Sequence, residues 1–117
     1  IHANSPRDCL SRIETCSLLS GIDIPLSALR AQVASAIDAV VHTARLSDGS
    51  RKITAVSEVL GLKDGEYVVK DLYRFQVRGI GPDGSLDGAF AGTGNKPGFL
   101  QEAALRNLPL DESMFEV

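Results

Sequence analysis

The segment Ser47-Asp48-Gly49-Ser50 constrains the fold most, because it lies between two stretches with the texture of β-strands. Residues 40–46 and 52–59 are rich in β-branched side chains and contain neither proline nor glycine. An Asp-Gly pair between such stretches is the strongest short signal for a β-hairpin. The sequence therefore predicts two antiparallel strands joined at this segment.

The register of this hairpin raises a question of charge. If Asp48 and Gly49 are the two turn residues, positions that sum to 97 face each other, so Arg45 faces Lys52. Two facing cations are unfavourable. Either the register differs, or a negative group lies beside them, which is Asp48 or a bound anion. We favour Asp48, because local partners are commoner than ligand sites.

Two helices are expected before the hairpin. Ser5-Pro6-Arg7-Asp8 combines a hydroxyl N-cap, proline at the first helical position and an early acid, which predicts a helix over Pro6–Ser20 that ends at Gly21. Apolar residues then recur at spacings of three and four, which predicts a second helix over Leu26–Ala39.

The second half reads as antiparallel strands. Turn signals at 63–65 and 81–84 separate strand candidates at 66–69, 72–79 and 85–91. Pro97 is expected to open a short helix, and an extended tail is expected from Leu108 through Phe115. The predicted class is thus α+β, with two N-terminal helices, antiparallel hairpins and a short C-terminal helix.

Composition excludes several classes of protein. The 117 residues suit one compact unit, and a net charge of −3 argues against a nucleic-acid binder that tracks phosphates. Apolar runs are far shorter than the roughly 20 residues of a membrane span. Cys9 and Cys16 are about 10 Å apart along one helix, too far for a disulfide, and fit small buried residues of a protein in a reducing compartment.

Few residues carry chemistry on their own. His2 precedes a helix N-cap, where its imidazole could donate to a phosphate or serve only as a loop histidine. His42 alternates with apolar residues, which favours a hydrogen-bonded core histidine. Arg45 and Arg51 flank the hairpin, and without further information they are a solvated pair. No catalytic triad or metal-ligand set emerges.

The glycine-rich segment Gly92–Gly98 is not a phosphate-binding loop. Such a loop needs Ser or Thr after its lysine, whereas Lys96 is followed by Pro97, which has no N–H to offer. A turn that leads into a helix is the better interpretation.

A resemblance to a known family extends this reading. Residues 1–8, with Leu10, Arg12 and Glu14, resemble the histidine box and following helix of the type II/type IV secretion ATPases, most closely the CpaF branch of tight-adherence pili. Similarity in order and spacing continues over nearly the whole chain. The further matching blocks are 32–38, 41–42, Arg45, 48–51, 58–59, 71–72, Phe75, 83–84, 93–99 and 108–115.

The resemblance implies the C-terminal part of a RecA-like P-loop NTPase. Such motors form rings, usually hexamers, at the cytoplasmic face of the inner membrane, where ATP and Mg²⁺ drive pilin or substrate through membrane platform proteins. His2 matches the residue near the γ-phosphate, where it senses hydrolysis or polarises the phosphate. Arg45 and Arg51 match family positions and are candidates for a phosphate-facing or interface role.

The nucleotide-binding motifs of that family precede its histidine box, so we expect the isolated chain to be a fragment that neither binds ATP tightly nor hydrolyses it. The alternative is a non-catalytic α+β protein-interaction module.

Overall fold

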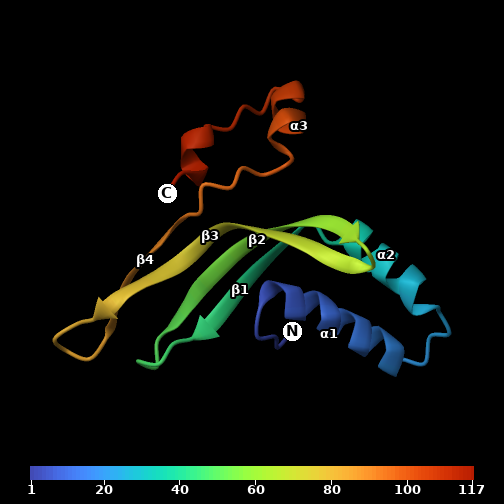
Figure 1. Cartoon of the computed structure of the whole chain (residues 1–117), viewed down its shortest axis with the longest axis horizontal. Helices are drawn as coiled ribbons and strands as arrows, with labels where there is room; N and C mark the ends of the chain where they lie inside the picture. The colour runs from blue at the N-terminus through green and yellow to red at the C-terminus, as the bar shows by residue number, and fades with distance from the viewer. The chain divides into compact units, whose positions relative to one another are not determined.

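The computed structural model describes residues 1–117 and contains one antiparallel sheet with helices at both ends of the chain. The strands follow the order β1-β2-β3-β4, so each pairs with its neighbour in sequence (Figure 1). The expected α+β class is therefore confirmed. The elements are α1 (Pro6–Leu19), α2 (Leu26–Ala36), β1 (Ala39–Arg45), β2 (Arg51–Lys63), β3 (Glu66–Ile80), β4 (Leu86–Gly92), α3 (Leu100–Leu105) and the 3-10 helix η1 (Glu112–Phe115).

The chain divides into two compact units, and the long strands β2 and β3 contribute to both. The first unit comprises residues 1–40 and 57–70, and the second comprises residues 41–56 and 71–117. Each unit is described by itself below.

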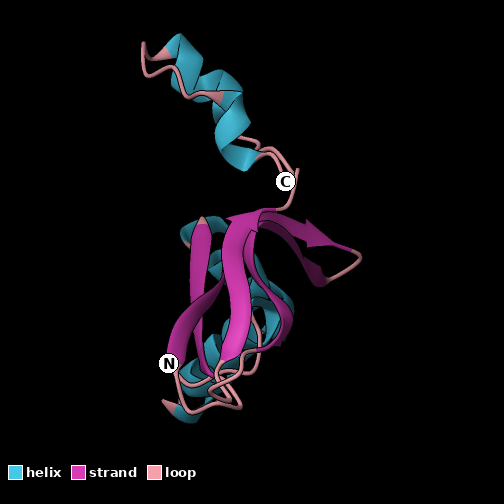
Figure 2. Cartoon of the chain, turned by 90° about the vertical axis from the view of Figure 1, so that its left-hand side faces the viewer, coloured by secondary structure: helices cyan, strands magenta, loops and turns pink.

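Helices α1 and α2 and part of the sheet form the core of the first unit, and the helices are cyan against magenta strands in Figure 2. Helix α1 starts as predicted, because the Ser5 hydroxyl accepts the Asp8 N–H at 3.0 Å and Pro6 takes the first helical position. Leu10 is completely buried. The buried cluster consists of Leu10, Leu29, Val33, Val40, Val59 and Tyr67.

Helix α2 ends three residues earlier than predicted. It stops at Ala36, and Ile37 adopts an extended backbone with φ −102° and ψ 120°. The Asp38 carbonyl then accepts the Val59 N–H at 2.9 Å, so sheet pairing captures residues that the apolar pattern assigned to the helix. Tertiary pairing overrides local periodicity here.

Three further predictions need correction. The candidates at 66–69 and 72–79 form one continuous strand, β3. The short helix α3 begins at Leu100 instead of Pro97. The tail is not extended throughout, because the Asp111 side chain accepts the Ser113 N–H and caps the 3-10 helix η1.

The first hairpin is present, but its turn has three residues instead of two. The Gly49 N–H donates to the Leu46 carbonyl at 2.9 Å, and the Leu46 N–H donates to the Ser50 carbonyl at 2.8 Å. Gly49 has φ 85°, the left-handed conformation that this turn requires after its type I corner. Facing positions therefore sum to 96, and the predicted pairing of Arg45 with Lys52 is wrong.

The β3–β4 hairpin repeats this geometry with nearly the same sequence. Gly84, with φ 82°, donates to the Gly81 carbonyl, and the Gly81 N–H donates to the Ser85 carbonyl at 2.7 Å. In both turns an aspartate Oδ1 accepts the N–H and the hydroxyl of the serine two residues later. Asp-Gly-Ser thus encodes the same turn twice.

Close packing marks two glycines of β4. A Cβ on Gly88 would lie 2.8 Å from the Phe75 ring, and a Cβ on Gly92 would lie 2.5 Å from the Glu116 carbonyl oxygen. The Gly94 N–H also donates to the Phe115 carbonyl at 2.7 Å. The C-terminal segment therefore returns to the end of β4 and contacts it backbone to backbone.

No helix of the chain is both long enough and apolar enough to cross a membrane.

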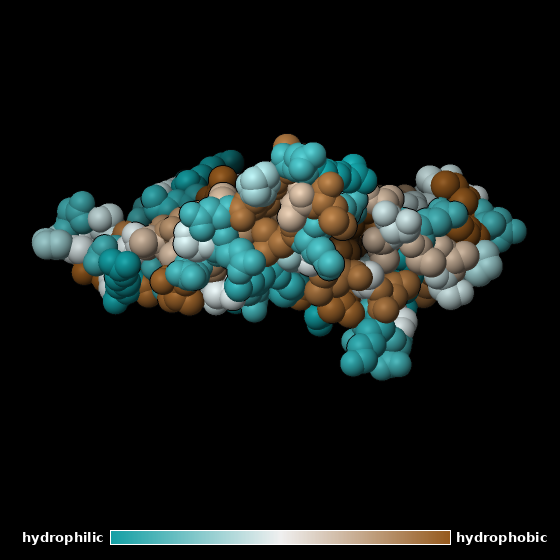
Figure 3. Space-filling view, turned by 90° about the horizontal axis from the view of Figure 1, so that it is seen from above, coloured by the Kyte–Doolittle hydropathy of each residue, from teal (hydrophilic) through white to brown (hydrophobic).

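Both cysteines are free, with Cys9 half-buried and Cys16 exposed. The expectation that both are buried is therefore wrong for Cys16, which lies on the outer side of α1. Brown apolar patches lie among the teal polar atoms in the surface view (Figure 3).

Candidate functional site

His2 lies in the exposed stretch that precedes α1. The Asp8 carboxylate accepts the Asn4 N–H at 2.8 Å, while the Asp8 N–H is held by Ser5. These contacts order the entry to the helix and leave the imidazole in solvent. The position is open to a ligand, and no side chain of the chain orients the ring.

Arg45 and Arg51 occupy the last position of β1 and the first position of β2. Both are exposed, and the observed register places them opposite each other. They belong to the second unit, whereas His2 belongs to the first. The hairpin thus brings together two of the three candidate residues.

Asp48 does not serve as the partner that the sequence suggested for Arg45. Its Oδ2 accepts the Leu86 N–H at 2.9 Å, and its Oδ1 accepts from Ser50. The Leu86 N–H, with the hydroxyl and N–H of Ser50, lowers the pKa of Asp48 to about 2. The Asp48 carboxylate is therefore held by hydrogen bonds within the two turns. The positive charge of nearby Lys52 lowers the pKa of Asp48 by a smaller amount.

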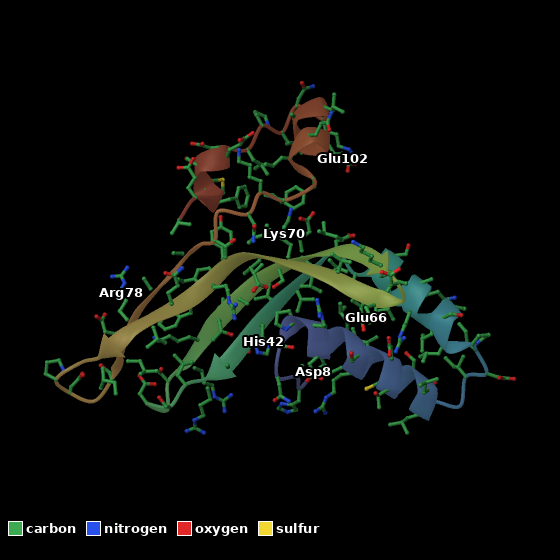
Figure 4. All side chains as sticks on the ribbon, viewed as in Figure 1. Asp8, His42, Glu66, Lys70, Arg78 and Glu102 are labelled. Carbon is green, nitrogen blue, oxygen red and sulfur yellow. The ribbon has the colours of Figure 1, made fainter.

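His42 is half-buried and is not a core residue. Its backbone carbonyl accepts the Thr54 hydroxyl at 3.3 Å, but no hydrogen bond forms with the imidazole. The prediction of a hydrogen-bonded core histidine is therefore wrong. The ring, labelled in Figure 4, lies on the half-buried side of β1 with Ala44.

Sequence reasoning missed a polar cluster inside the first unit. Glu14 of α1 is only 7% exposed, and its Oε1 accepts the Tyr67 hydroxyl at 2.6 Å and the Arg30 Nε at 2.9 Å. Burial, together with the adjacent carboxylate, raises the pKa of Tyr67, so the phenol stays protonated and donates. A buried carboxylate needs such donors, because an unpaired charge in the interior is costly.

A cavity of about 230 Å³ opens beside this cluster. Figure 4 labels Glu66, which lies at its β3 side. Two arginines and two glutamates line the cavity, so their formal charges cancel and no class of ligand is favoured by charge. Its lining residues are Arg7, Ser11, Glu14, Arg30, Gly65, Glu66 and Tyr67.

One signal in the sequence could have revealed Glu14. It stands one helical turn after Leu10, on the side of α1 that Leu10 and Ile13 define as apolar. An acid at a core position indicates a buried partner. Neither Tyr67 nor Arg30 is marked by spacing, since both come from distant segments.

Two further acids with low exposure lie near cations. Glu58 is buried at 3.9 Å from the Lys70 ammonium, and Asp71 lies 3.4 Å from Arg74. No group of three or more His, Cys, Asp or Glu side chains is placed to hold a metal ion.

Comparison with known proteins adds no assignment, because no protein-family model and no curated protein matches the chain.

Proposed function

We propose that this chain is the C-terminal part of a secretion or pilus ATPase of the CpaF branch, within a RecA-like P-loop domain. The block from Ile1 to Asp8, followed by Arg12 and Glu14, carries the proposal, because it is the specific part of the resemblance. It is supported by the exposed position of His2 directly before a capped helix. In this proposal the full-length protein forms a hexameric ring and acts on membrane platform proteins from the cytoplasmic side.

His2 would act on the terminal phosphate of ATP. An imidazole N–H placed near the γ-phosphate stabilises the charge that develops during hydrolysis, and it changes partner when the phosphate leaves. Mg²⁺ would neutralise the phosphates when ATP is bound. No covalent step is assigned to the histidine.

The chain itself offers no phosphate cradle. Lys96, the one lysine of the glycine-rich segment, forms an ion pair with Glu112, and Pro97 follows it. We therefore propose that the motifs that bind ATP and Mg²⁺ precede Ile1 in the full-length protein. Calorimetry on these 117 residues is expected to give no micromolar binding of ATP, and such binding would contradict this placement.

The decisive experiment combines the upstream reading frame with a variant of the full-length protein. We expect G-x-x-x-x-G-K-[ST] roughly one hundred residues before Ile1, the scale of one domain. Replacement His2→Ala is expected to lower the ATPase rate about 100-fold. The control His42→Gln, on β1, is expected to leave the rate within about twofold.

Two other outcomes would contradict parts of this proposal, and the first would favour the non-catalytic interaction module. An upstream reading frame that encodes no phosphate-binding motif would refute the ATPase proposal. If the motif is present but His2→Ala hydrolyses ATP and assembles pili normally, the motor stands and the role of His2 does not.

A further inference from the structure

We propose that Arg45 and Arg51 form a binding site for a phosphate group at the end of the first hairpin. The inference rests on the geometry of this hairpin alone and does not require the chain to belong to an ATPase.

The register of the first hairpin places the two arginines together. Hydrogen bonds from the Leu46 N–H to Ser50 and from the Thr54 hydroxyl to the His42 carbonyl agree with facing positions that sum to 96. Arg45 and Arg51 are therefore directly opposite each other, at the positions where the ladder begins. Like charges at facing positions destabilise a sheet unless something neutralises them.

Three other exposed arginines of the chain lie near acids, whereas Arg7 and Arg78, which are also exposed, form no ion pair. Arg12 is 3.7 Å from Asp8, Arg74 is 3.4 Å from Asp71, and Arg106 is 2.7 Å from Glu102. No carboxylate lies within ion-pair distance of Arg45 or Arg51.

Asp48, the acid between the two arginines in sequence, has other partners. The Asp48 carboxylate is held by Ser50 and by the Leu86 N–H of the neighbouring hairpin. Lys52 contributes a further attraction to Asp48, and its ammonium also lies 5.7 Å from the centre of the Phe75 ring. Since side chains alternate along a strand, Lys52 points to the opposite face from Arg51.

A phosphate group suits this pair of arginines. The next facing pair on the same side is Thr43 and Ile53, so β1 and β2 place no further charge beside the arginines on this face. Two guanidinium groups present paired N–H donors, and one tetrahedral dianion can accept from both. A phosphate thus removes the repulsion between the arginines, whereas a single carboxylate carries only half the required charge.

The test is an NMR titration of the chain with inorganic phosphate, with chloride adjusted to hold ionic strength constant. We expect saturable shifts of the backbone amides at 45–51. Each of Arg45→Gln and Arg51→Gln is expected to weaken phosphate binding about fivefold or more. Arg45→Lys should retain part of the affinity for phosphate, because lysine keeps the positive charge but lacks the paired N–H donors of the guanidinium group.

Arg78 provides the matched control. It is exposed, forms no ion pair, and its side chain projects away from β3 near the β3–β4 hairpin (Figure 4). On its β4 side no arginine faces it, since Val77 pairs with Gly88 and Gly79 pairs with Asp87. Arg78→Gln should therefore leave the titration unchanged. Shifts that do not saturate, or that persist equally in Arg45→Gln, would overturn the proposal.

Two further binding experiments distinguish a soluble phosphate compound from a lipid headgroup as the natural ligand. The same variants are titrated with ATP and sedimented with phosphatidylglycerol vesicles, with phosphatidylcholine vesicles as reference. Arginine-dependent binding of ATP identifies a soluble phosphate compound. Arginine-dependent binding to phosphatidylglycerol identifies a lipid headgroup. These two experiments only identify the source, because the absence of saturable, arginine-dependent binding of inorganic phosphate by itself refutes the site.

Discussion

Tyr67 and Tyr73 stand six residues apart on β3, and each anchors its own unit by a different kind of contact. The Tyr67 hydroxyl donates to the buried Glu14 carboxylate at 2.6 Å, whereas the Tyr73 hydroxyl donates to the Met114 carbonyl at 2.9 Å. Tyr67 is 6% exposed and Tyr73 is half-buried. Tyr73 instead gains aromatic contacts, with ring centres 5.5 Å from Phe90 and 5.8 Å from Phe115.

The difference shows where a hydrogen bond matters to stability. A buried carboxylate that loses a donor keeps its charge away from water, so the loss carries most of the desolvation penalty. A backbone carbonyl at a half-exposed site can accept from water when its donor is removed. The first unit therefore depends on a polar contact, and the second depends on ring packing and on close backbone contact.

The largest effect is expected from Tyr67→Phe. Removal of the donor to Glu14 should lower the free energy of unfolding by about 2 kcal/mol, measured by urea denaturation. In a Glu14→Gln background the same substitution should cost about half as much, because a neutral amide needs the donor less. Equal losses in the two backgrounds would show that the carboxylate charge is not the cause.

Gly92→Ala is expected to have the next largest effect and to act in the second unit. The new Cβ would meet the Glu116 carbonyl oxygen at 2.5 Å, so the C-terminal segment must move. Overpacking of this kind costs about 1 to 2 kcal/mol. Faster hydrogen exchange at the Gly94 amide would report the displacement, since that N–H donates to Phe115. Unchanged exchange would mean that the segment does not depend on this contact.

A smaller effect is expected from Tyr73→Phe. The ring contacts with Phe90 and Phe115 are retained, and water can replace the lost donor to Met114. The free energy of unfolding should fall by about 0.5 kcal/mol, in the same urea measurement used for Tyr67. A loss as large as that of Tyr67→Phe would remove the distinction between the two anchors.

The smallest effect concerns pH and the two Asp-Gly-Ser turns. Hydrogen bonds lower the pKa of both Asp48 and Asp83, and Asp48 has an additional donor in the Leu86 N–H. A lowered folded-state pKa gives stability above the unfolded value near 3.8, and that stability is lost as pH falls toward about 2. NMR titration of the side-chain carboxyl carbons should give a lower midpoint for Asp48 than for Asp83. The reverse order would contradict the bond to Leu86.

Local sequence signals predicted the elements well where the chemistry is local. Ser5-Pro6 placed the start of α1, and the Asp-Gly pairs placed all three hairpin turns. The register of the first hairpin was missed by one residue, because Asp-Gly fits both a two-residue turn and a three-residue turn with glycine in the left-handed region. Only the hydrogen bonds around Leu46 distinguish them.

The candidate site was predicted less completely. Arg45 and Arg51 were singled out, but their facing arrangement follows only from the corrected register. Glu14 was noted without a role, since its partners Arg30 and Tyr67 are 16 and 53 residues away in sequence. Contacts between such distant residues arise from tertiary packing, and single-sequence patterns do not encode them.

Gly79 and Gly88 lie close together in the β3–β4 ladder, and a saturation mutagenesis library should treat them very differently. At Gly79 a Cβ meets nothing within 4 Å, whereas at Gly88 it enters the space of the Phe75 ring, which also lies beneath the Lys52 ammonium. Variants at 79 should be recovered with almost any side chain. Variants at 88 should be depleted whatever residue stands at 75, because the same Cβ would also lie 2.5 Å from the backbone carbonyl oxygen of Gln76.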